Sequence, residues 1–262
     1  MKMTSDFIGA GDIQKVVAKN INGQKTDPMT TCFPILEEIS AGQFKILGTG
    51  FFVLNFGVFL TAKHVFEDVI NFQTGEQLRP IVIMHAVGNG DYLARPVSQV
   101  VINNTSDVAL CLAANVDKNN NKIKNKVIEI SFDTPSIGSK IFTYAYPEST
   151  HSLDSINLVD GVYPGEITNF HPVKRDSIFL SWPVFETDMY IYGGASGGPV
   201  FNNGVAFAVN TSSFQNEEGV LPCSYVTPIR EAAGLYVPGL NNLDGSKIIL
   251  ADAVDLNFQP SK

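Results

Sequence analysis

The sequence is most informative at GGASGGP, the stretch from Gly193 to Pro199, in which four glycines surround a single serine, Ser196. A plain flexible turn is one interpretation of so many glycines. A nucleophilic serine, however, needs a tight turn that exposes its Oγ and leaves nearby backbone N–H groups free to face an oxyanion. Glycines permit both features, so Ser196 is the leading candidate for a catalytic nucleophile.

Two further segments supply the partners that such a serine requires. His64 ends the segment Thr61-Ala62-Lys63-His64, directly after an apolar run, and Asp107 opens the apolar run Val108–Leu112. Taken alone, a histidine at the end of a strand is more often a structural hydrogen-bonding group. An aspartate before a strand is more often a turn residue. Together with Ser196 they provide the base and the acid of a triad.

The order of these residues along the chain distinguishes the known triad classes. Residues 194–198 also fit the G-x-S-x-G pattern of α/β-hydrolases, in which the serine precedes the acid and the histidine. That class is excluded because all four histidines precede Ser196: His64, His85, His151 and His171. The subtilisin order needs an acid before His64, where the chain is weakly patterned. The order His64, Asp107, Ser196 matches the chymotrypsin arrangement.

The strand pattern predicts an all-β protein. From residue 30 onward, short runs rich in Val, Ile, Phe and Thr alternate with Gly, Asn, Asp and Pro, which is typical of a β-barrel or sandwich. Hydrophobic residues make up 44% of the chain and charged residues 17%, which fits a compact β protein. A polar gap places His64 and Asp107 in a first strand set and Ser196 in a second. The predicted active site is the cleft between the two sets.

Five segments are predicted along the chain. They are an N-terminal extension (1–28), a first β-barrel (29–114), an inter-barrel linker (115–126), a second β-barrel (127–227), and a C-terminal helix and tail (228–262). Within the last segment, Pro228–Leu235 predicts a short helix with proline in its first turn. The apolar run Lys247–Val254 fits either a strand or a helical turn.

Composition excludes several classes of function. The formal net charge of -8 argues against binding to nucleic acid. The three cysteines are widely spaced, which predicts neither a disulfide framework nor a zinc site. We expect no metal, no membrane span and no secretory leader, and therefore a cytoplasmic protein with free thiols.

Together the motifs resemble those of the trypsin-like serine peptidases, and most closely those of the HtrA-type proteases. Residues 48–52 (GTGFF) and 60–65 (LTAKHV) are similar to the family's G-S/T-G-F/V entry strand and its T-A/N-x-H-V histidine motif. Residues 106–110 (SDVAL) are similar to its D-I/V-A-L motif. Residues 186–188 (ETD) and 194–199 (GASGGP) are similar to its Q-T-D and G-N-S-G-G-P elements. The resemblance runs from about residue 44 to about residue 228.

The resemblance implies a chymotrypsin-like fold. Two six-stranded antiparallel Greek-key β-barrels would enclose the cleft, with a short C-terminal helix beyond them. One departure is Ala195, which stands before Ser196 where secreted trypsins have aspartate. The ion pair that activates their zymogens therefore has no counterpart here. We also expect no PDZ domain after residue 240.

The resemblance also assigns roles. It implies a serine endopeptidase that forms an acyl-enzyme through His64, Asp107 and Ser196, without a cofactor. The backbone of Gly194, Ala195 and Ser196 would form the oxyanion hole. The implied partners are a protein or peptide substrate and an activating partner. A catalytically silent or latent binding module and a non-peptide esterase are the alternatives.

The primary specificity pocket is placed by the same resemblance. Its base would lie at Tyr190, where trypsins carry aspartate, so cleavage after Arg or Lys is not expected. The remaining substrate-binding candidates edge the pocket and favour a small or apolar residue: Ile191, Thr211, Ser212 and Tyr225.

Overall fold

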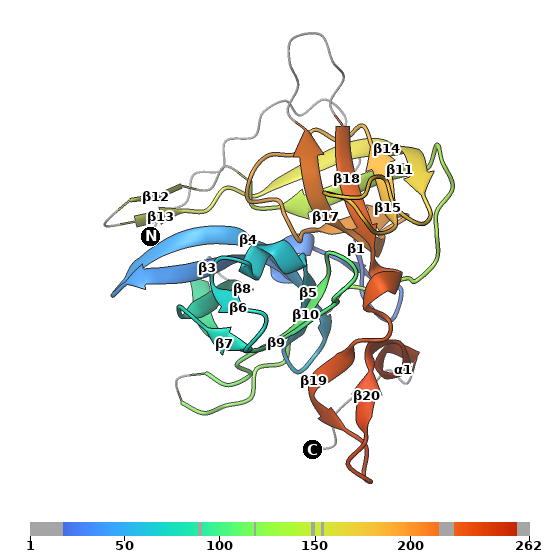
Figure 1. Ribbon diagram of the computed structural model, residues 1–262. Coiled ribbons are helices and arrows are strands. Elements are labelled where there is room, and N and C mark those ends of the chain that lie inside the picture. Colours follow the sequence, from blue (N-terminus) through green and yellow to red (C-terminus); the bar gives the residue numbers. More distant parts are fainter. Residues whose placement is uncertain are drawn as a thin grey trace.

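The computed structural model describes residues 18–88, 91–117, 119–147, 150–152, 155–214 and 223–255. Most of the predicted N-terminal extension, residues 1–17, and the end of the predicted tail, residues 256–262, lie outside these ranges. Figure 1 shows two β-barrels packed against each other, with a C-terminal segment alongside the first.

The first barrel carries the predicted histidine and aspartate motifs. Its strands close in the order β10-β5-β4-β3-β8-β9, and all neighbours are antiparallel. The bounds are β3 (Cys32–Ser40), β4 (Gln43–Leu54), β5 (Val58–Thr61), β8 (Ile81–Gly88), β9 (Asp91–Ile102) and β10 (Ala109–Ala113). Its interior is aromatic: Phe33 packs against Phe52 with ring centroids 4.5 Å apart, and against Phe59 at 5.3 Å.

The second barrel carries the predicted serine motif. Its strands close in the order β11-β14-β15-β18-β17-β16. The bounds are β11 (Lys140–Ala145), β14 (Gly161–His171), β15 (Val184–Thr187), β16 (Pro199–Asn202), β17 (Val205–Phe214) and β18 (Cys223–Pro228). Numbered within each barrel, the strands of both barrels follow the same cyclic order, 1-2-3-6-5-4. The all-β prediction of two six-stranded antiparallel barrels is therefore confirmed.

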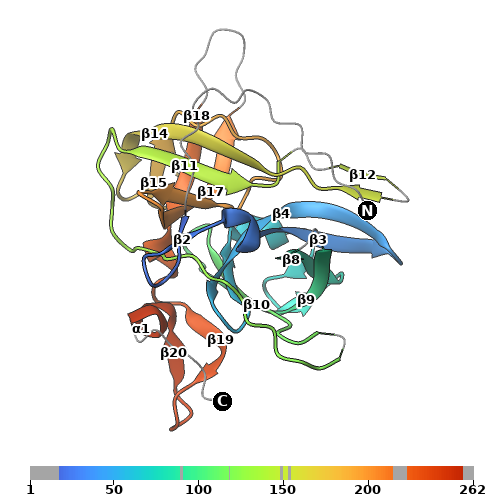
Figure 2. The same cartoon turned by 180° about the vertical axis from the view of Figure 1, so that it is seen from behind.

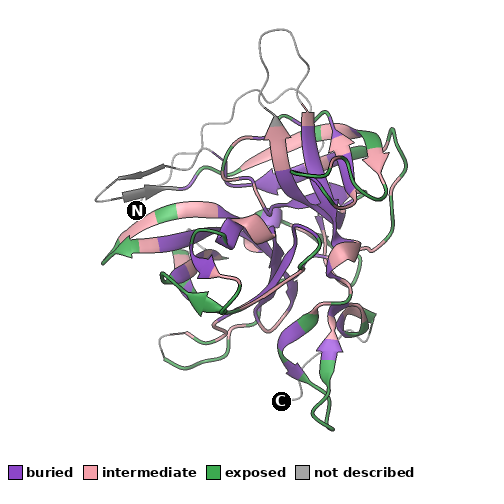
Figure 3. Cartoon of the chain, viewed as in Figure 1, coloured by how far each residue is buried: buried purple, intermediate pink, exposed green. Residues whose placement is uncertain are grey.

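The barrels are joined by an apolar cluster that both contribute to. Side chains on a strand alternate between its faces, so strands that are apolar on both faces can fill a barrel and also pack outside it. Cys32 and Phe51 of the first barrel pack in one cluster with Tyr146 and Phe201 from the second-barrel side. In Figure 3 the buried residues accordingly extend through both barrels and the region where they meet. This packing fixes the barrels relative to each other.

Short elements precede the first barrel or connect the barrel strands. They are β1 (Ala18–Lys19), β2 (Lys25–Thr26), the 3₁₀ helix η1 (Pro28–Thr30), the 3₁₀ helix η2 (Lys63–Phe66), β6 (Ile70–Asn71), β7 (Glu76–Gln77), β12 (Thr150–Ser152) and β13 (Ser155–Asn157). The connector between β10 and β11 contains only isolated bridges, among them one between Ile130 and Ala206. Figure 2 shows this connector passing along the outside of the molecule from the first barrel to the second.

The C-terminal segment differs from the prediction in detail. The helix predicted at Pro228–Leu235 is the 3₁₀ helix η3 (Ile229–Ala232), because the chain then extends as β19 (Tyr236–Asn241) to bury Val237 and Leu240. The apolar run that was ambiguous between strand and helix forms both, as β20 (Lys247–Ile249) and α1 (Leu250–Asp255). A short C-terminal α-helix is present, as predicted, but it is α1 at Leu250–Asp255 and not the predicted Pro228–Leu235. No helix within the described ranges is long and apolar enough to cross a membrane.

Candidate active site

The pairing of β5 with β10 brings His64 and Asp107 together. Thr61, the last residue of β5, lies opposite Ala109, the first residue of β10. His64 follows β5 on η2 and Asp107 precedes β10, so both residues lie just beyond the same end of this strand pair. Two residues far apart in sequence thereby meet at the rim of the first barrel.

Asp107 holds His64 through two hydrogen bonds. Its Oδ2 lies 2.8 Å from His64 Nδ1, and its Oδ1 accepts the His64 backbone N–H at 2.9 Å. The Asp107 side chain is buried, whereas the His64 side chain remains 34% exposed. Because a carboxylate only accepts hydrogen bonds, Nδ1 carries the proton and Nε2 is left as the basic nitrogen.

The pKa of His64 follows from these surroundings. Burial lowers the pKa of the imidazole, but the hydrogen bond and the charge of Asp107, with the charge of Glu67, outweigh burial. The pKa therefore lies above the usual value of 6.5. A raised pKa makes His64 a stronger base, and it places the acid limb of any His64-dependent activity above pH 6.5.

Ser196 lies in a tight loop between β15 and β16. The Ala195 N–H donates to the Tyr192 carbonyl at 3.2 Å, and Gly194 has a φ of +91°, as the third position of a type II turn requires. Gly197 has a φ of +82°, and a Cβ there would stand 2.0 Å from Thr61 Oγ1. The glycines predicted to shape this loop thus permit a left-handed backbone and a close approach to the first barrel.

The loop docks beside the histidine motif. The Thr49 N–H donates to the Ser196 carbonyl at 2.8 Å. A Cβ on Gly48 would lie 2.7 Å from both the Ser196 carbonyl oxygen and Val65 Cγ2. The Ser196 backbone therefore lies close to Val65, the residue that follows His64. Between the described side chains of Ser196 and His64, no hydrogen bond of 3.5 Å or less is formed. Such catalytic hydrogen bonds are often long without substrate.

The backbone donors of the loop are not equivalent. The Ala195 N–H is already used by the Tyr192 carbonyl. Within the described part of the chain, the N–H groups of Gly194 and Ser196 have no hydrogen-bond acceptor. Of the three predicted backbone donors, Gly194 and Ser196 are therefore available and Ala195 is not, and the oxyanion hole stays a prediction.

The predicted pocket residues have different surroundings. Tyr190 is 46% exposed and meets the Tyr192 ring at 4.8 Å, whereas Ile191 is buried in the second-barrel core. Tyr225 packs with Leu180 in a separate cluster. The structure thus places Ile191 and Tyr225 in different apolar clusters.

The other two pocket candidates lie on β17. Thr211 is buried, with its Oγ1 2.6 Å from Thr227 Oγ1, and Ser212 pairs with Tyr225 across the strands. The five-residue pocket stays a prediction.

Two buried polar side chains that were not assigned from the sequence support the serine loop. Thr49 Oγ1 donates to the Gly194 carbonyl at 2.9 Å. Asn210 Nδ2 donates to the Ala195 carbonyl at 3.2 Å. The only sequence signal for Thr49 is its place in the G-T-G entry motif, and nothing local connects either residue to the loop.

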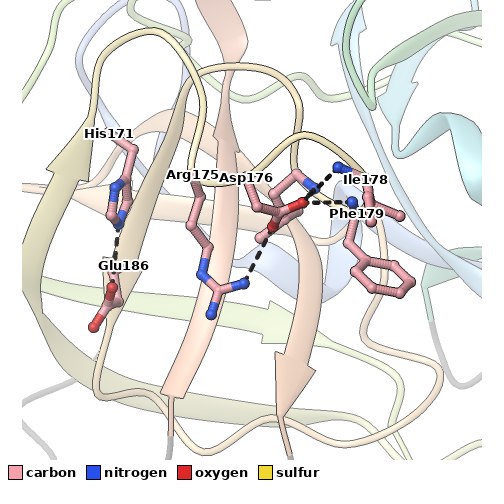
Figure 4. A network of polar contacts seen from close by, with 7 residues as sticks. His171, Arg175, Asp176, Ile178, Phe179 and Glu186 are labelled. Carbon is pink, nitrogen blue, oxygen red and sulfur yellow. Dashed lines mark hydrogen bonds and ion pairs between the residues drawn. The ribbon is translucent and has the colours of Figure 1, made fainter.

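A second polar network lies on the outer face of the second barrel (Figure 4). Asp176 Oδ1 accepts the backbone N–H groups of Ile178 and Phe179 at 2.8 and 2.6 Å, and Asp176 Oδ2 accepts from Arg175 at 3.2 Å. These hydrogen bonds, first of all those from the backbone, lower the pKa of Asp176 to about 2. Nearby, His171 Nε2 lies 3.2 Å from Glu186 Oε2. This network orders the loop that links β14 to β15.

Among the described residues, no group of three or more His, Cys, Asp or Glu side chains is arranged to hold a metal ion. All three cysteines are free thiols, and Cys32 and Cys111 are buried.

Both closed barrels have the same strand order, and together they define a chymotrypsin-like fold. The first barrel carries a His–Asp pair, and the second carries a serine framed by glycines. The chain belongs to the trypsin-like peptidase domain family, which residues 48–206 match. The family resemblance predicted from the motifs is thereby confirmed. No curated protein matches the sequence.

Solved structures share the fold. The serine endoprotease from Yersinia pestis aligns with a TM-score of 0.53 and 20% identity, covering 77% of this chain and 59% of that chain. Deg5 aligns with a TM-score of 0.56 and 18% identity, covering 77% of this chain and 84% of that chain. The chain thus spans 59% of the length of the Yersinia protein.

Proposed function

We propose that this peptidase-family protein is a serine endopeptidase that cleaves protein or peptide substrates through an acyl-enzyme. The observation that carries the proposal is the two-point hydrogen bonding of buried Asp107 to His64, at 2.8 and 2.9 Å, beside the docked Ser196 loop. The bond from Nδ1 to the carboxylate leaves Nε2 as the basic nitrogen. A base that is oriented by a carboxylate needs this arrangement.

The chemistry follows from these positions. Ser196 Oγ attacks the peptide carbonyl carbon while His64 Nε2 takes the hydroxyl proton. The carbonyl oxygen becomes an oxyanion that accepts hydrogen bonds from the Gly194 and Ser196 N–H groups. In a serine protease, each such donor lowers the activation free energy by about 3–4 kcal/mol. Collapse breaks the C–N bond, and His64 gives its proton to the leaving amine. Water then hydrolyses the acyl-enzyme by the same base.

A latent form is the second candidate. It is favoured by one observation: Ser196 Oγ and the His64 imidazole are not hydrogen-bonded within 3.5 Å in the described chain. In this form a partner that completes the contact would activate the protein. We further propose a cytoplasmic location, which the free thiols of Cys32, Cys111 and Cys223 support.

The test combines turnover with labelling of the nucleophile. Wild-type protein should cleave dye-labelled casein and react with a fluorophosphonate probe, and Ser196→Ala should lose about 10⁶-fold in kcat and all labelling. Ser98→Ala is the matched control, because Ser98 is exposed on β9 and its hydroxyl donates only to Leu112 O. Full casein turnover by Ser196→Ala would refute the proposal. Labelling without turnover would favour the latent form, and turnover of simple esters alone would favour an esterase.

A further inference from the structure

We propose that Thr49, a residue of the first barrel, is a positioning residue that fixes the oxyanion donors of the Ser196 loop. The inference rests on the proposed function, since it concerns the same reaction. Thr49 does not touch the reacting atoms. It acts by holding the carbonyls of Gly194 and Ser196, one on each side of the peptide that carries the Ser196 N–H.

Thr49 makes four hydrogen bonds, three to the second-barrel side and one within the first barrel. Its side-chain hydroxyl donates to Gly194 O at 2.9 Å and accepts the Tyr146 N–H at 3.1 Å. Its backbone N–H donates to Ser196 O at 2.8 Å, and its carbonyl accepts from Thr61 Oγ1 at 2.7 Å. Thr49 is fully buried, at 0% exposure, so water does not compete for these partners.

The first consequence concerns the Gly194–Ala195 peptide. In a trans peptide the C=O and the N–H point in opposite directions. Because Thr49 Oγ1 holds the Gly194 carbonyl on one side, the Ala195 N–H faces the other side, where it donates to Tyr192 O at 3.2 Å. That bond closes the turn containing Gly194. The hydroxyl of Thr49 therefore stabilises the turn that presents the Gly194 N–H.

The second consequence concerns Ser196. The Ala195 carbonyl points into the loop, toward the Gly198 N–H at 3.0 Å and Asn210 Nδ2 at 3.2 Å. The Ser196 N–H on the same peptide must then point out of the loop. Thr49 holds the carbonyls of the preceding and following peptides, at Gly194 and Ser196. The outward Ser196 N–H thus lies between the Gly194 and Ser196 carbonyls, both of which accept hydrogen bonds from Thr49.

This arrangement explains why a hydroxyl is required at residue 49. A threonine or serine hydroxyl can donate one hydrogen bond and accept others at the same time. The Thr49 hydroxyl uses both capacities, toward Gly194 and toward Tyr146. Valine has the same shape but neither capacity, whereas serine keeps both and lacks only a methyl group.

The experiment measures kcat and KM separately with a fluorogenic peptide selected from a library by the wild-type protein. We expect Thr49→Val to lower kcat about 10- to 100-fold with KM nearly unchanged, the pattern of a lost transition-state interaction. Thr49→Ser should stay within about threefold of wild type. Affinity for a peptide aldehyde, which forms a tetrahedral adduct, should fall in parallel with kcat, and affinity for the product peptide should not.

Thr31→Val is the matched control. Thr31 is also fully buried in the first barrel region, and its hydroxyl donates to Pro28 O at 3.0 Å, away from the Ser196 loop. This variant should keep wild-type kcat. If Thr49→Val does not fold, Thr49→Cys replaces it, because a thiol is a weak donor and should give a smaller loss than valine but a larger one than serine.

The outcomes separate this inference from the proposed function. An active wild type with Thr49→Val, or Thr49→Cys, at wild-type kcat would overturn the positioning role and leave the peptidase proposal intact. A parallel loss of stability and KM without a change in kcat would also overturn it, because that pattern is purely structural. A wild type with neither turnover nor labelling would overturn the proposed function and the role of Thr49 with it.

Discussion

Replacing Gly197 by alanine tests the docking of the serine loop without any assumption about substrate. The new Cβ would stand 2.0 Å from Thr61 Oγ1, 2.5 Å from Thr49 O and 2.7 Å from Ala62 N. Real Cβ atoms do not approach other atoms this closely, and two of the three neighbours are backbone atoms of the first barrel. The loop must therefore move away from the end of β5.

The magnitude follows from the parts that change. A φ of +82° costs an alanine about 1–2 kcal/mol. Moving the loop strains two hydrogen bonds of 2.7 Å each, Gly197 N–H to Asn210 O and Thr61 Oγ1 to Thr49 O. Each contributes about 1 kcal/mol net. The expected loss in the free energy of unfolding is about 3–4 kcal/mol, a large fraction of the roughly 5–15 kcal/mol of a typical domain.

The assay is denaturant unfolding of Gly197→Ala beside the control Gly193→Ala. No atom lies within 4 Å of a Cβ at Gly193, so the control should change the unfolding free energy by less than about 1 kcal/mol. Equal unfolding free energies for Gly197→Ala and Gly193→Ala would refute the close approach of the loop to β5.

Three further results are expected from the polar groups of the first barrel. Asp107→Asn should lower kcat by about 10⁴, the magnitude known for the corresponding trypsin variant, because an amide donor favours the wrong His64 tautomer; unchanged single-turnover acylation would contradict it. In a pH profile of kcat/KM, activity should fall as the pH drops through a pKa above 6.5, and Glu67→Gln should move that midpoint to lower pH. Burial and the charge of Arg95 lower the pKa of His85 to about 4 from 6.5. Between pH 6.5 and about pH 4 the unfolded chain therefore binds more protons than the folded chain. The free energy of unfolding should fall by about 3 kcal/mol as the pH is lowered through this range. His85→Gln, followed by thermal unfolding at each pH, should remove most of that fall.

The likeness to solved proteases is a likeness of fold, at 20% and 18% identity. It establishes the two-barrel fold, and the family match adds the peptidase class. The chemistry proposed for this chain therefore depends on its own contacts. Those contacts are the Asp107–His64 pair and the hydrogen bonds of Thr49 to the Ser196 loop.

Asp176 and Asp107 show that the groups around a carboxylate decide what it does. Asp176 accepts several backbone N–H groups and has a pKa of about 2, yet it only orders an exposed loop. Asp107 also accepts a backbone N–H, but its second oxygen faces an imidazole. Hydrogen-bonded carboxylates are common in loops, and the histidine partner is what makes Asp107 the candidate for a role in chemistry.

The sequence by itself determined the class of fold and predicted the residues of a triad. Short apolar runs with turn residues between them specify strands, because side-chain alternation and turn chemistry are local properties. The glycines around Ser196 indicated a tight loop for the same reason, since a positive φ at Gly194 and Gly197 is a property of single residues. The order of His64, Asp107 and Ser196 then selected one triad class from three.

Only the tertiary structure decided which backbone N–H groups of the Ser196 loop are left without an acceptor among the described residues, and which side chains hold the loop. Thr49 and Gly194 are 145 residues apart, and their hydrogen bond exists because two barrels pack against each other. The fold of the second barrel also places Ile191 and Tyr225 in different apolar clusters. Peptide orientation and pocket shape depend on contacts between distant segments, and no local pattern in the sequence encodes such contacts.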